Sequence, residues 1–246
     1  MKTSKNILLE VKNVSLTYSS LGFFSRFKHH ALTDVSFSVY KGETFGIMGR
    51  NGCGKSTLLQ ILADVIAPTT GYIETSQKIT RALLSVGLGF NLHLSGRDNA
   101  LISAMLQGAT KKQAKQVLES IKEFSELGDF FEQPVKTYSS GMRSRLGFAT
   151  ALKTEVDLLL LDETLSVGDA SFNKKAEQAM IDKFDSEQTV IFVSHNGEQV
   201  KRLCDRAIWI EKGKVIREGD VEDVADVYQV FMKKLKDKKA EERRFG

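Results

Sequence analysis

The stretch Gly49-Arg50-Asn51-Gly52-Cys53-Gly54-Lys55-Ser56-Thr57 decides the fold of this chain. It fits the pattern G-x-x-x-x-G-K-[ST], in which a glycine-rich turn surrounds phosphate oxygens with backbone N–H groups. The apolar residues 45–48 before it predict a buried strand, and residues 58–62 after it predict a helix. Because the pattern requires this strand–loop–helix context, the sequence predicts a nucleotide-binding loop rather than a chance glycine-rich turn.

Each polar residue of this loop has an expected role. Lys55 is predicted to place its charge on the β- and γ-phosphates, and the Ser56 hydroxyl is predicted to bind Mg²⁺. The helix that begins near Lys55 would direct the positive end of its dipole at the phosphates. The other loop residues expected to contact the nucleotide are Gly49, Asn51, Gly52, Cys53, Gly54 and Thr57.

Composition sets broad limits on what the chain can be. Its 246 residues, 41% of them hydrophobic, are enough for one large α/β domain with a real core. The net charge of +4 suits an acidic ligand, an anionic membrane surface or RNA, without choosing among them. Cys53 and Cys204 do not have the spacing of a zinc site, and two cysteines do not make a disulfide framework. No signal peptide and no membrane-spanning stretch is expected, so a role at a membrane would need another chain to supply the span.

The residues before the loop predict two antiparallel strands joined by an unusual connection. Residues 7–18 and 31–39 alternate between apolar and polar side chains, as half-buried strands do. Tyr18, at the end of the first strand, is expected either to stack on an adenine base or to lie in the core. Residues 19–30 place three phenylalanines beside basic residues. They suit either a loop or short helix whose aromatics pack down, or an amphipathic segment at a membrane interface.

Helical patterns dominate the middle of the chain. Residues 95–128 predict an inserted helical subdomain, clearest in the apolar stripe Val117, Leu118, Ile121, Phe124 and Leu127. The segment Tyr138-Ser139-Ser140-Gly141-Met142 predicts a further helix start, which is either an ordinary cap or an anion site. Strands are predicted at 71–74, 79–86 and 207–219, with Trp209 in the core. The tail from Val221 predicts a helix that frays through the charged run 233–244.

Two further strands end in chemically useful residues. Residues 156–161 predict a buried parallel strand that ends in Asp162 and Glu163, where α/β sheets bind their ligands. Asp162 is expected to hold Mg²⁺ through water, and Glu163 to polarise the attacking water; two solvated charges are the alternative. Residues 189–194 predict another strand, which ends in His195. His195 is expected to contact the γ-phosphate or the attacking water, and a structural histidine is the alternative.

The order of these features resembles that of the ATP-binding subunit of ABC transporters over essentially the whole chain. The resemblance implies that Tyr18 stacks on adenine, residues 49–57 form the Walker A loop and 138–142 the signature. It further implies that Asp162 and Glu163 are the Walker B pair, 166–169 the D-loop and His195 the switch histidine. In that family two subunits enclose ATP, so Ser139, Ser140 and Gly141 of one copy would face the Walker A loop of the other.

Two departures from the family pattern indicate a subgroup. The signature has Tyr, Ser and Met where the family usually has L-S-G-G-Q, and no glutamine precedes the helical insert, so Ser85 is the nearest polar candidate for Mg²⁺. Its hydroxyl is shorter than a glutamine amide. The phrases at 89–90, 94–99, 124–128, 138–143 and 165–169 resemble exporters of bacterial cell-surface polysaccharide. Such subunits can place a helix beside the membrane entrance for the glycan, which would give residues 21–27 a role.

The sequence thus predicts an α/β fold, a P-loop NTPase core of ABC type with an antiparallel β subdomain and an inserted helical subdomain. The predicted limits are a single domain 1–246, with its core at 1–90 and 150–246, the helical subdomain at 91–149 and the C-terminal helix and charged tail at 221–246.

The expected function is Mg²⁺-dependent ATP hydrolysis by a homodimer, with Glu163, His195 and Lys55 as catalytic residues. A separate transmembrane permease would then export a lipid-linked O-antigen, capsule or teichoic acid, with this chain on the cytoplasmic face of the bacterial inner membrane. No nucleic-acid partner is expected. The alternatives are a subunit of another ABC transporter, or a soluble ABC ATPase acting on ribosomes or DNA. The latter usually carries two fused ATPase domains or a long coiled coil.

Overall fold

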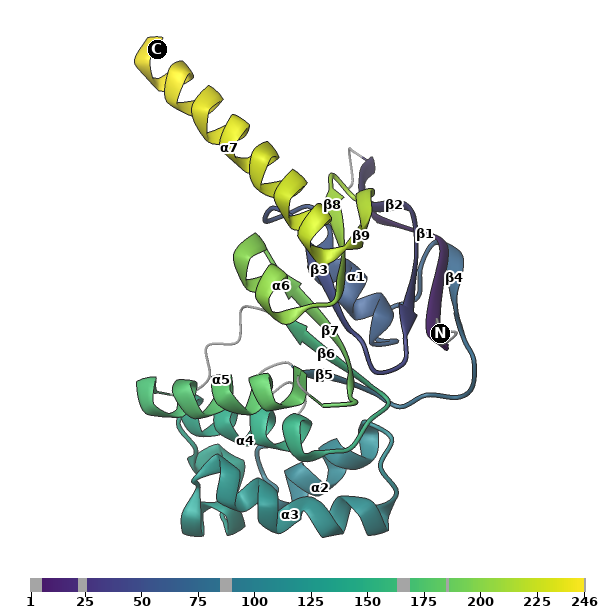
Figure 1. Cartoon of the computed structure of the whole chain (residues 1–246). Helices are drawn as coiled ribbons and strands as arrows, with labels where there is room; N and C mark the ends of the chain where they lie inside the picture. Colours follow the sequence, from purple (N-terminus) through teal and green to yellow (C-terminus); the bar gives the residue numbers. More distant parts are fainter. Residues whose placement is uncertain (1–5, 22–25, 85–89, 163–168, 185, 246) are drawn as a thin grey trace. The chain divides into compact units, whose positions relative to one another are not determined.

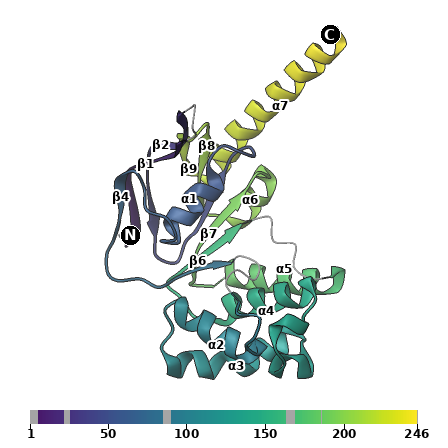
Figure 2. The same ribbon diagram turned by 180° about the vertical axis from the view of Figure 1, so that it is seen from behind.

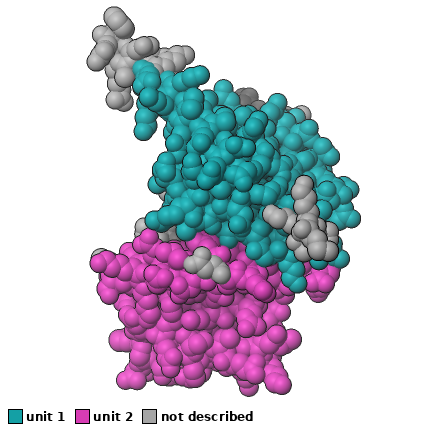
Figure 3. Space-filling model, in the orientation of Figure 1, with its two compact units in different colours: residues 1–76, 191–246 teal, residues 77–190 magenta. Residues whose placement is uncertain are grey.

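The computed structural model describes residues 6–21, 26–84, 90–162, 169–184 and 186–245, and it divides the chain into two compact units. Unit 1 comprises residues 1–76 and 191–246, and unit 2 comprises residues 77–190 (Figure 3). Each unit combines strands with helices, in agreement with the predicted α/β class.

An antiparallel sheet of unit 1 has the strand order β2-β1-β4. Its strands are β1 (Ile7–Leu21), β2 (Arg26–Tyr40) and β4 (Thr70–Thr75). Alternate residues of β1 and β2 are fully buried, among them Leu9, Val14 and Val35, as the period-two pattern predicted.

The connection at residues 19–30 is largely paired strand and not the loop or short helix that was one of its predicted forms, while its placement at a membrane interface stays a prediction. β1 and β2 continue through it as paired strands, with Ser19 opposite Lys28 and Leu21 opposite Arg26. An extended ladder satisfies the backbone N–H and C=O groups that a long loop would leave to solvent, and the hydroxyl of Thr17 also bonds His30 Nδ1 at 2.9 Å. Residues 22–25 lie outside the described residues.

A second set of strands in unit 1 has the order β7-β3-β8-β9. These strands are β3 (Thr44–Met48), β7 (Thr189–Ser194, in this unit from residue 191), β8 (Arg206–Glu211) and β9 (Lys214–Asp220). β3 runs parallel to β8, and β8 forms an antiparallel hairpin with β9. β3 and β7 are buried along their whole length, as their continuous apolar sequences predicted.

Three helices complete unit 1: α1 (Lys55–Leu62), α6 (Gly197–Leu203) and α7 (Val221–Phe245). α7 begins directly after β9 and extends away from the hairpin as a long helix (Figures 1 and 2). It continues through the charged run for which fraying was predicted. That run consists mainly of Lys, Glu, Arg, Ala and Leu, which all favour helix, and it contains neither glycine nor proline.

Unit 2 holds two strands and most of the helices. The parallel strands are β5 (Arg81–Leu84) and β6 (Leu158–Asp162). The helices are α2 (Gly96–Leu106), α3 (Lys111–Ser125), α4 (Ser140–Lys153) and α5 (Ala170–Phe184), with short 3₁₀ turns at Gly128–Glu132 and Val135–Thr137. Side-chain oxygens cap all four of these helices: the N-cap is Ser95 for α2, Thr110 for α3, Ser139 for α4 and Asp169 for α5.

The core of unit 2 is built around three phenylalanine rings. Phe124 of α3 stacks on Phe148 of α4, with ring centroids 6.0 Å apart, and Phe172 of α5 meets both rings edge-on. Lys153 and Lys175 lie over the Phe124 ring, at 5.0 and 4.7 Å from its centroid. The predicted apolar stripe of α3 therefore faces this core, which fixes the position of α4 and its N-terminal signature segment.

Candidate functional site

The glycine-rich loop connects β3 to α1, as predicted. Gly52 and Gly54 have φ values of 79° and 109°, in the left-handed region that favours glycine. A side chain at Gly54 would also meet the carbonyl oxygen of Ala31, because a Cβ there would lie 2.5 Å from that oxygen. The loop therefore has a tight backbone with no side chain at these two positive-φ positions, as the sequence pattern requires.

The N-terminus of α1 is open to an anion. Its N-cap is Gly54, which has no side chain to bond the N–H groups of the first turn, unlike the serine and threonine caps of α2, α3 and α4. Ser56 is exposed in that first turn, so its hydroxyl can reach an ion held outside the loop. Backbone N–H groups, a helix dipole and a hydroxyl at this point fit a nucleotide phosphate and its metal ion.

Lys55 lies over the loop that precedes it. Its Nζ donates hydrogen bonds to the carbonyl oxygens of Gly49, at 2.7 Å, and Arg50, at 3.0 Å. The ammonium group is thus held at the mouth of the loop by two neutral acceptors rather than by a carboxylate. Phosphate oxygens are stronger acceptors because they are charged, so this position suits a lysine that binds phosphate.

Cys53, the least usual residue of the loop, is buried. Burial raises the pKa of its thiol, so the group stays protonated and neutral at pH 7. Its backbone carbonyl accepts a hydrogen bond of 2.9 Å from the N–H of Gly213, in the β8–β9 turn. The backbone of Cys53 therefore connects the loop to the β8–β9 turn. Its thiol is in the neutral form, which is not the nucleophilic thiolate.

Tyr18 and His195 also belong to unit 1. Tyr18 lies on β1 opposite His29, and its side chain is 45% exposed, so the ring is free to stack on a planar ligand and is not the core tyrosine of the alternative interpretation. His195 directly follows β7, the neighbour of β3 in the strand order, and it is exposed. Its backbone carbonyl accepts a 3.3 Å hydrogen bond from the hydroxyl of Tyr228 in α7.

The signature segment lies at the start of α4 in unit 2. The Ser139 side chain caps the helix by accepting from the N–H of Met142 at 3.2 Å, and Ser139 and Ser140 are exposed. Arg143 donates to the carbonyl of Tyr138 at 2.8 Å, which closes the turn before the helix. The segment is thus a capped helix start at which both serines are exposed.

Tyr138 anchors this helix start to the rest of unit 2. Its hydroxyl donates to the carbonyl of Phe130 at 2.5 Å and stands so close to Gly96 that a Cβ there would lie 2.2 Å from it. Burial raises the pKa of this tyrosine to about 12. Sequence reasoning treated Tyr138 only as a variant of the usual leucine and missed this contact.

Replacing Tyr138 with phenylalanine is expected to lower the free energy of unfolding by about 1 kcal/mol at pH 7, the usual size of one hydrogen bond. The cost stays modest because Phe130 O also accepts from the N–H of Gln133 at 2.8 Å. The folded pKa is the higher one, so the tyrosine's contribution is complete below pH 10 and is lost as the pH rises toward 12. Urea unfolding of both proteins from pH 7 to pH 11 measures this difference.

The matched control is Tyr72→Phe, at a tyrosine that is 57% exposed. It should leave the stability unchanged across the same pH range. A Tyr138→Phe protein as stable as the wild type at pH 7, or a difference that does not shrink above pH 10, would contradict the assigned role of the hydroxyl.

Several predicted site residues lie outside the described residues. Asp162 is the last residue of β6 and is half-buried, but Glu163 and Ser85 are not described, nor are residues 166–168 of the predicted D-loop. Asp169 caps α5 by accepting from the N–H of Phe172 at 3.0 Å, a bond that lowers its pKa. Among the described residues, no group of three or more His, Cys, Asp and Glu could hold a metal ion.

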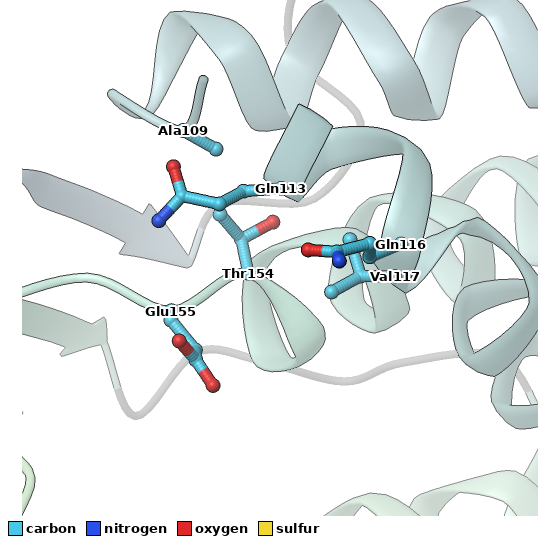
Figure 4. A pocket seen from close by; sticks show the side chains of 6 residues that line it. All are labelled: Ala109, Gln113, Gln116, Val117, Thr154 and Glu155. Carbon is cyan, nitrogen blue, oxygen red and sulfur yellow. The ribbon is translucent and has the colours of Figure 1, made fainter. Parts of the chain in front are cut away.

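A pocket of about 150 Å³ lies in unit 2, and none of the residues predicted to bind nucleotide lines it (Figure 4). Its lining comes from the start of α3 and the segment after α4: Ala109, Gln113, Gln116, Val117, Thr154 and Glu155. Gln113 is already engaged in the capping box of α3, where its Oε1 accepts from the N–H of Thr110 at 2.9 Å. Nothing in this lining resembles a phosphate site.

Comparison with known proteins identifies the family. The chain matches the ABC transporter family over residues 32–166, more than half of its length, and it therefore belongs to that family. The matched range includes the loop at 49–57, the signature segment and Asp162.

Relatives of this chain are named after the export of cell-surface polymers. The O-antigen export system ATP-binding protein RfbB of Klebsiella pneumoniae is 43% identical over 205 residues, covering 83% of each chain. The teichoic acids export ATP-binding protein TagH of Staphylococcus haemolyticus is 40% identical over 87% of this chain and 81% of its own length. The TagH protein of Bacillus anthracis is 41% identical over 88% of this chain, which spans only 39% of that longer relative.

Solved structures agree on the fold. A dimeric ATP-binding cassette in a post-hydrolysis state, bound to ADP and phosphate, matches with a TM-score of 0.69 at 22% identity, over 87% of this chain and 99% of its own. An ATP-binding subunit of an ABC transporter matches with a TM-score of 0.73 at 21% identity, over 90% of this chain and 93% of its own. The predicted ABC-type fold is therefore confirmed.

No helix among the described residues is both long and apolar enough to cross a membrane.

Proposed function

We propose that this chain is the ATP-hydrolysing subunit of an ABC transporter that exports a lipid-linked cell-surface polysaccharide. The observation that carries the proposal is the phosphate-binding loop in a chain whose relatives, at 40–43% identity, are named for O-antigen and teichoic acid export. The wider polymer class includes capsule.

In this proposal the loop binds the triphosphate of ATP. Lys55 moves from the carbonyls of Gly49 and Arg50 to the β- and γ-phosphates, and the first-turn N–H groups of α1 bond phosphate oxygens. The ring of Tyr18, which is exposed, stacks on the adenine. The remaining loop contacts are those predicted from the sequence: Gly49, Asn51, Gly52, Cys53, Gly54 and Thr57.

Hydrolysis requires a metal ion and a polarised water. Ser56 and Asp162 would hold Mg²⁺, with Ser85 as the third candidate, and the metal would supply positive charge to the phosphates. Glu163 acts as the general base that polarises the attacking water, and His195 bonds the γ-phosphate. In unit 1 Ser56 is exposed, and in unit 2 Asp162 is the last residue of a strand, each of which suits a metal ligand.

A second copy would complete the site. Ser139, Ser140 and Gly141 of the partner would face the phosphate-binding loop across a homodimer, and their exposed hydroxyls and helix N-terminus suit the γ-phosphate. The proposal keeps the domain limits expected from the sequence: a single domain 1–246 with a core at 1–90 and 150–246, a helical subdomain at 91–149 and a C-terminal helix and charged tail at 221–246. The dimer would lie on the cytoplasmic face of the inner membrane, against a separate transmembrane permease.

Reconstitution tests the proposal. The chain, together with the membrane protein that co-purifies with it, placed in proteoliposomes, should hydrolyse ATP faster when a lipid-linked glycan is added. A reaction with the free lipid carrier is the control. ATPase activity that ignores the lipid-linked glycan and responds to another solute would indicate a different transporter. Salt-dependent RNA binding without membrane association would instead indicate a soluble ABC ATPase.

A further inference from the structure

The side chain of Arg50, inside the phosphate-binding loop, bonds the carboxylate of Glu211 in the β8–β9 hairpin. Its Nε donates to both carboxylate oxygens of Glu211, at 3.1 and 3.0 Å, and its Nη2 forms a further ion pair with the same group. The Glu211 side chain is only 10% exposed and that of Arg50 35%. A forked, partly buried pair of this kind is far better defined than a surface salt bridge.

The guanidinium of Arg50 also contacts the C-terminal helix. It lies over the ring of Phe231 in α7, 5.7 Å from the ring centroid. Phe231 in turn packs on Trp209 of β8 with centroids 4.7 Å apart, and Tyr228 of α7 meets the same indole at 5.7 Å. Arg50 is thus held from one side by the hairpin carboxylate and from the other by an aromatic residue of α7.

The backbone of the loop is fixed to the same hairpin. Gly49 approaches the carbonyl of Ile210 so closely that a Cβ on this glycine would lie 2.3 Å from that oxygen. Cys53 accepts a hydrogen bond from Gly213 in the hairpin turn. The carbonyl of Arg50 accepts from Lys55 Nζ at 3.0 Å and from the N–H of Cys53 at 3.2 Å. The backbone that Arg50 anchors is therefore the same backbone that positions Lys55.

We propose that Arg50 is a positioning residue through which α7, by way of Phe231 and Glu211, holds the phosphate-binding loop in the form that accepts ATP. The inference rests on the proposed function, since it assumes that ATP binds at this loop. It adds a role for the C-terminal helix, which bonds the backbone carbonyl of His195 through Tyr228 and would act on the phosphate-binding loop itself through Arg50. Anything that shifts α7 would then change the affinity of the loop for ATP.

A double-mutant cycle on ATP binding tests this role. Phe231→Ala, Arg50→Ala and the double variant of the full chain are titrated with a fluorescent ATP analogue, and thermal unfolding is recorded for each. Phe231→Ala is expected to raise the Kd about fivefold, which corresponds to a coupling of about 1 kcal/mol. The double variant should bind ATP no more weakly than Arg50→Ala alone, because both changes remove the same contact between Arg50 and the Phe231 ring.

The matched control is Val230→Ala, at an apolar residue of the same helix that is 56% exposed. Its Kd should stay within about twofold of the wild type, as expected for a change outside the coupled set. A merely structural role of Phe231 would lower the melting temperature and leave the Kd of the folded protein unchanged. If Phe231→Ala does not fold, Phe231→Leu removes the ring face while keeping an apolar side chain, and the same cycle applies.

The outcomes separate this inference from the proposed function. A wild-type chain that does not bind the analogue overturns both. If the wild-type chain binds the analogue and the Phe231 variants have an unchanged Kd, the positioning role alone is overturned. The same holds if the fold-change in Kd of the double variant equals the product of the two single-variant fold-changes.

Discussion

Replacing Lys55 with alanine is expected to weaken ATP binding about 100-fold, the size expected from losing charge-assisted hydrogen bonds worth about 3 kcal/mol. The Nζ of Lys55 is held by the carbonyls of Gly49 and Arg50, within the loop and beside the open N-terminus of α1. The loop's other basic side chain, Arg50, cannot replace this positive charge, because its guanidinium is bonded to Glu211. Calorimetric titration with ATP measures the change.

Two controls define what the lost affinity means. Lys41→Ala removes an exposed lysine of the same unit and should leave the Kd unchanged. The melting temperature of the Lys55→Ala protein without nucleotide should fall by only a few degrees, because the carbonyls that Lys55 bonds can bond water instead, and a net loss of about 1 kcal/mol corresponds to about 2–4 °C. Tight ATP binding by the folded Lys55→Ala protein would remove the basis for assigning this loop to phosphate.

The parts of the fold that were predicted from the sequence rest on local patterns. The loop at 49–57 needs its glycines because Gly52 and Gly54 adopt positive φ. All of its predicted phosphate-binding groups therefore come from one short stretch of sequence. The buried strands β3, β6 and β7 are short apolar runs, and the stripe of α3 repeats at the helical period. Such signals need no knowledge of distant contacts.

The features that the sequence did not predict depend on contacts that no local residue pattern indicates. Arg50 and Glu211 are 161 positions apart, so nothing near either residue indicates the ion pair. Tyr138 looked like a substitution in the signature, and its hydrogen bond to Phe130 depends on how two 3₁₀ turns fold back. The strand pairing across residues 19–21 and 26–30 was also missed, because the cluster of phenylalanines and basic residues suggested an amphipathic segment.

For the predicted catalytic residues, the structure gives the position of some in the fold but the role of none toward ATP. The phosphate-binding loop, the signature helix and Asp162 lie where the sequence placed them, after β3, at the start of α4 and at the end of β6. The roles of these residues toward ATP remain predictions. The role of Glu163 is also a prediction, and a single substitution tests it directly.

Replacing Glu163 with glutamine is expected to lower the rate of ATP hydrolysis by at least about 100-fold, the lower end of what general-base catalysis contributes. The amide has the shape of the carboxylate but can neither accept a proton nor carry a negative charge, so water next to the γ-phosphate is no longer polarised. ATP binding depends on the loop and its lysine, and should persist. Steady-state phosphate release and a titration with ATP measure the two effects separately.

The same variant reports on the proposed dimer. If two copies enclose ATP, blocking hydrolysis should make the closed form accumulate, so Glu163→Gln should elute as a dimer in Mg²⁺ and ATP and as a monomer without nucleotide. Glu187→Gln, at an exposed acid of the same unit, is the control and should hydrolyse ATP like the wild type. Unchanged hydrolysis by Glu163→Gln would exclude it as the general base. Loss of ATP binding together with hydrolysis would mean that the carboxylate is needed to hold the nucleotide, so that the water-polarising group must be sought elsewhere.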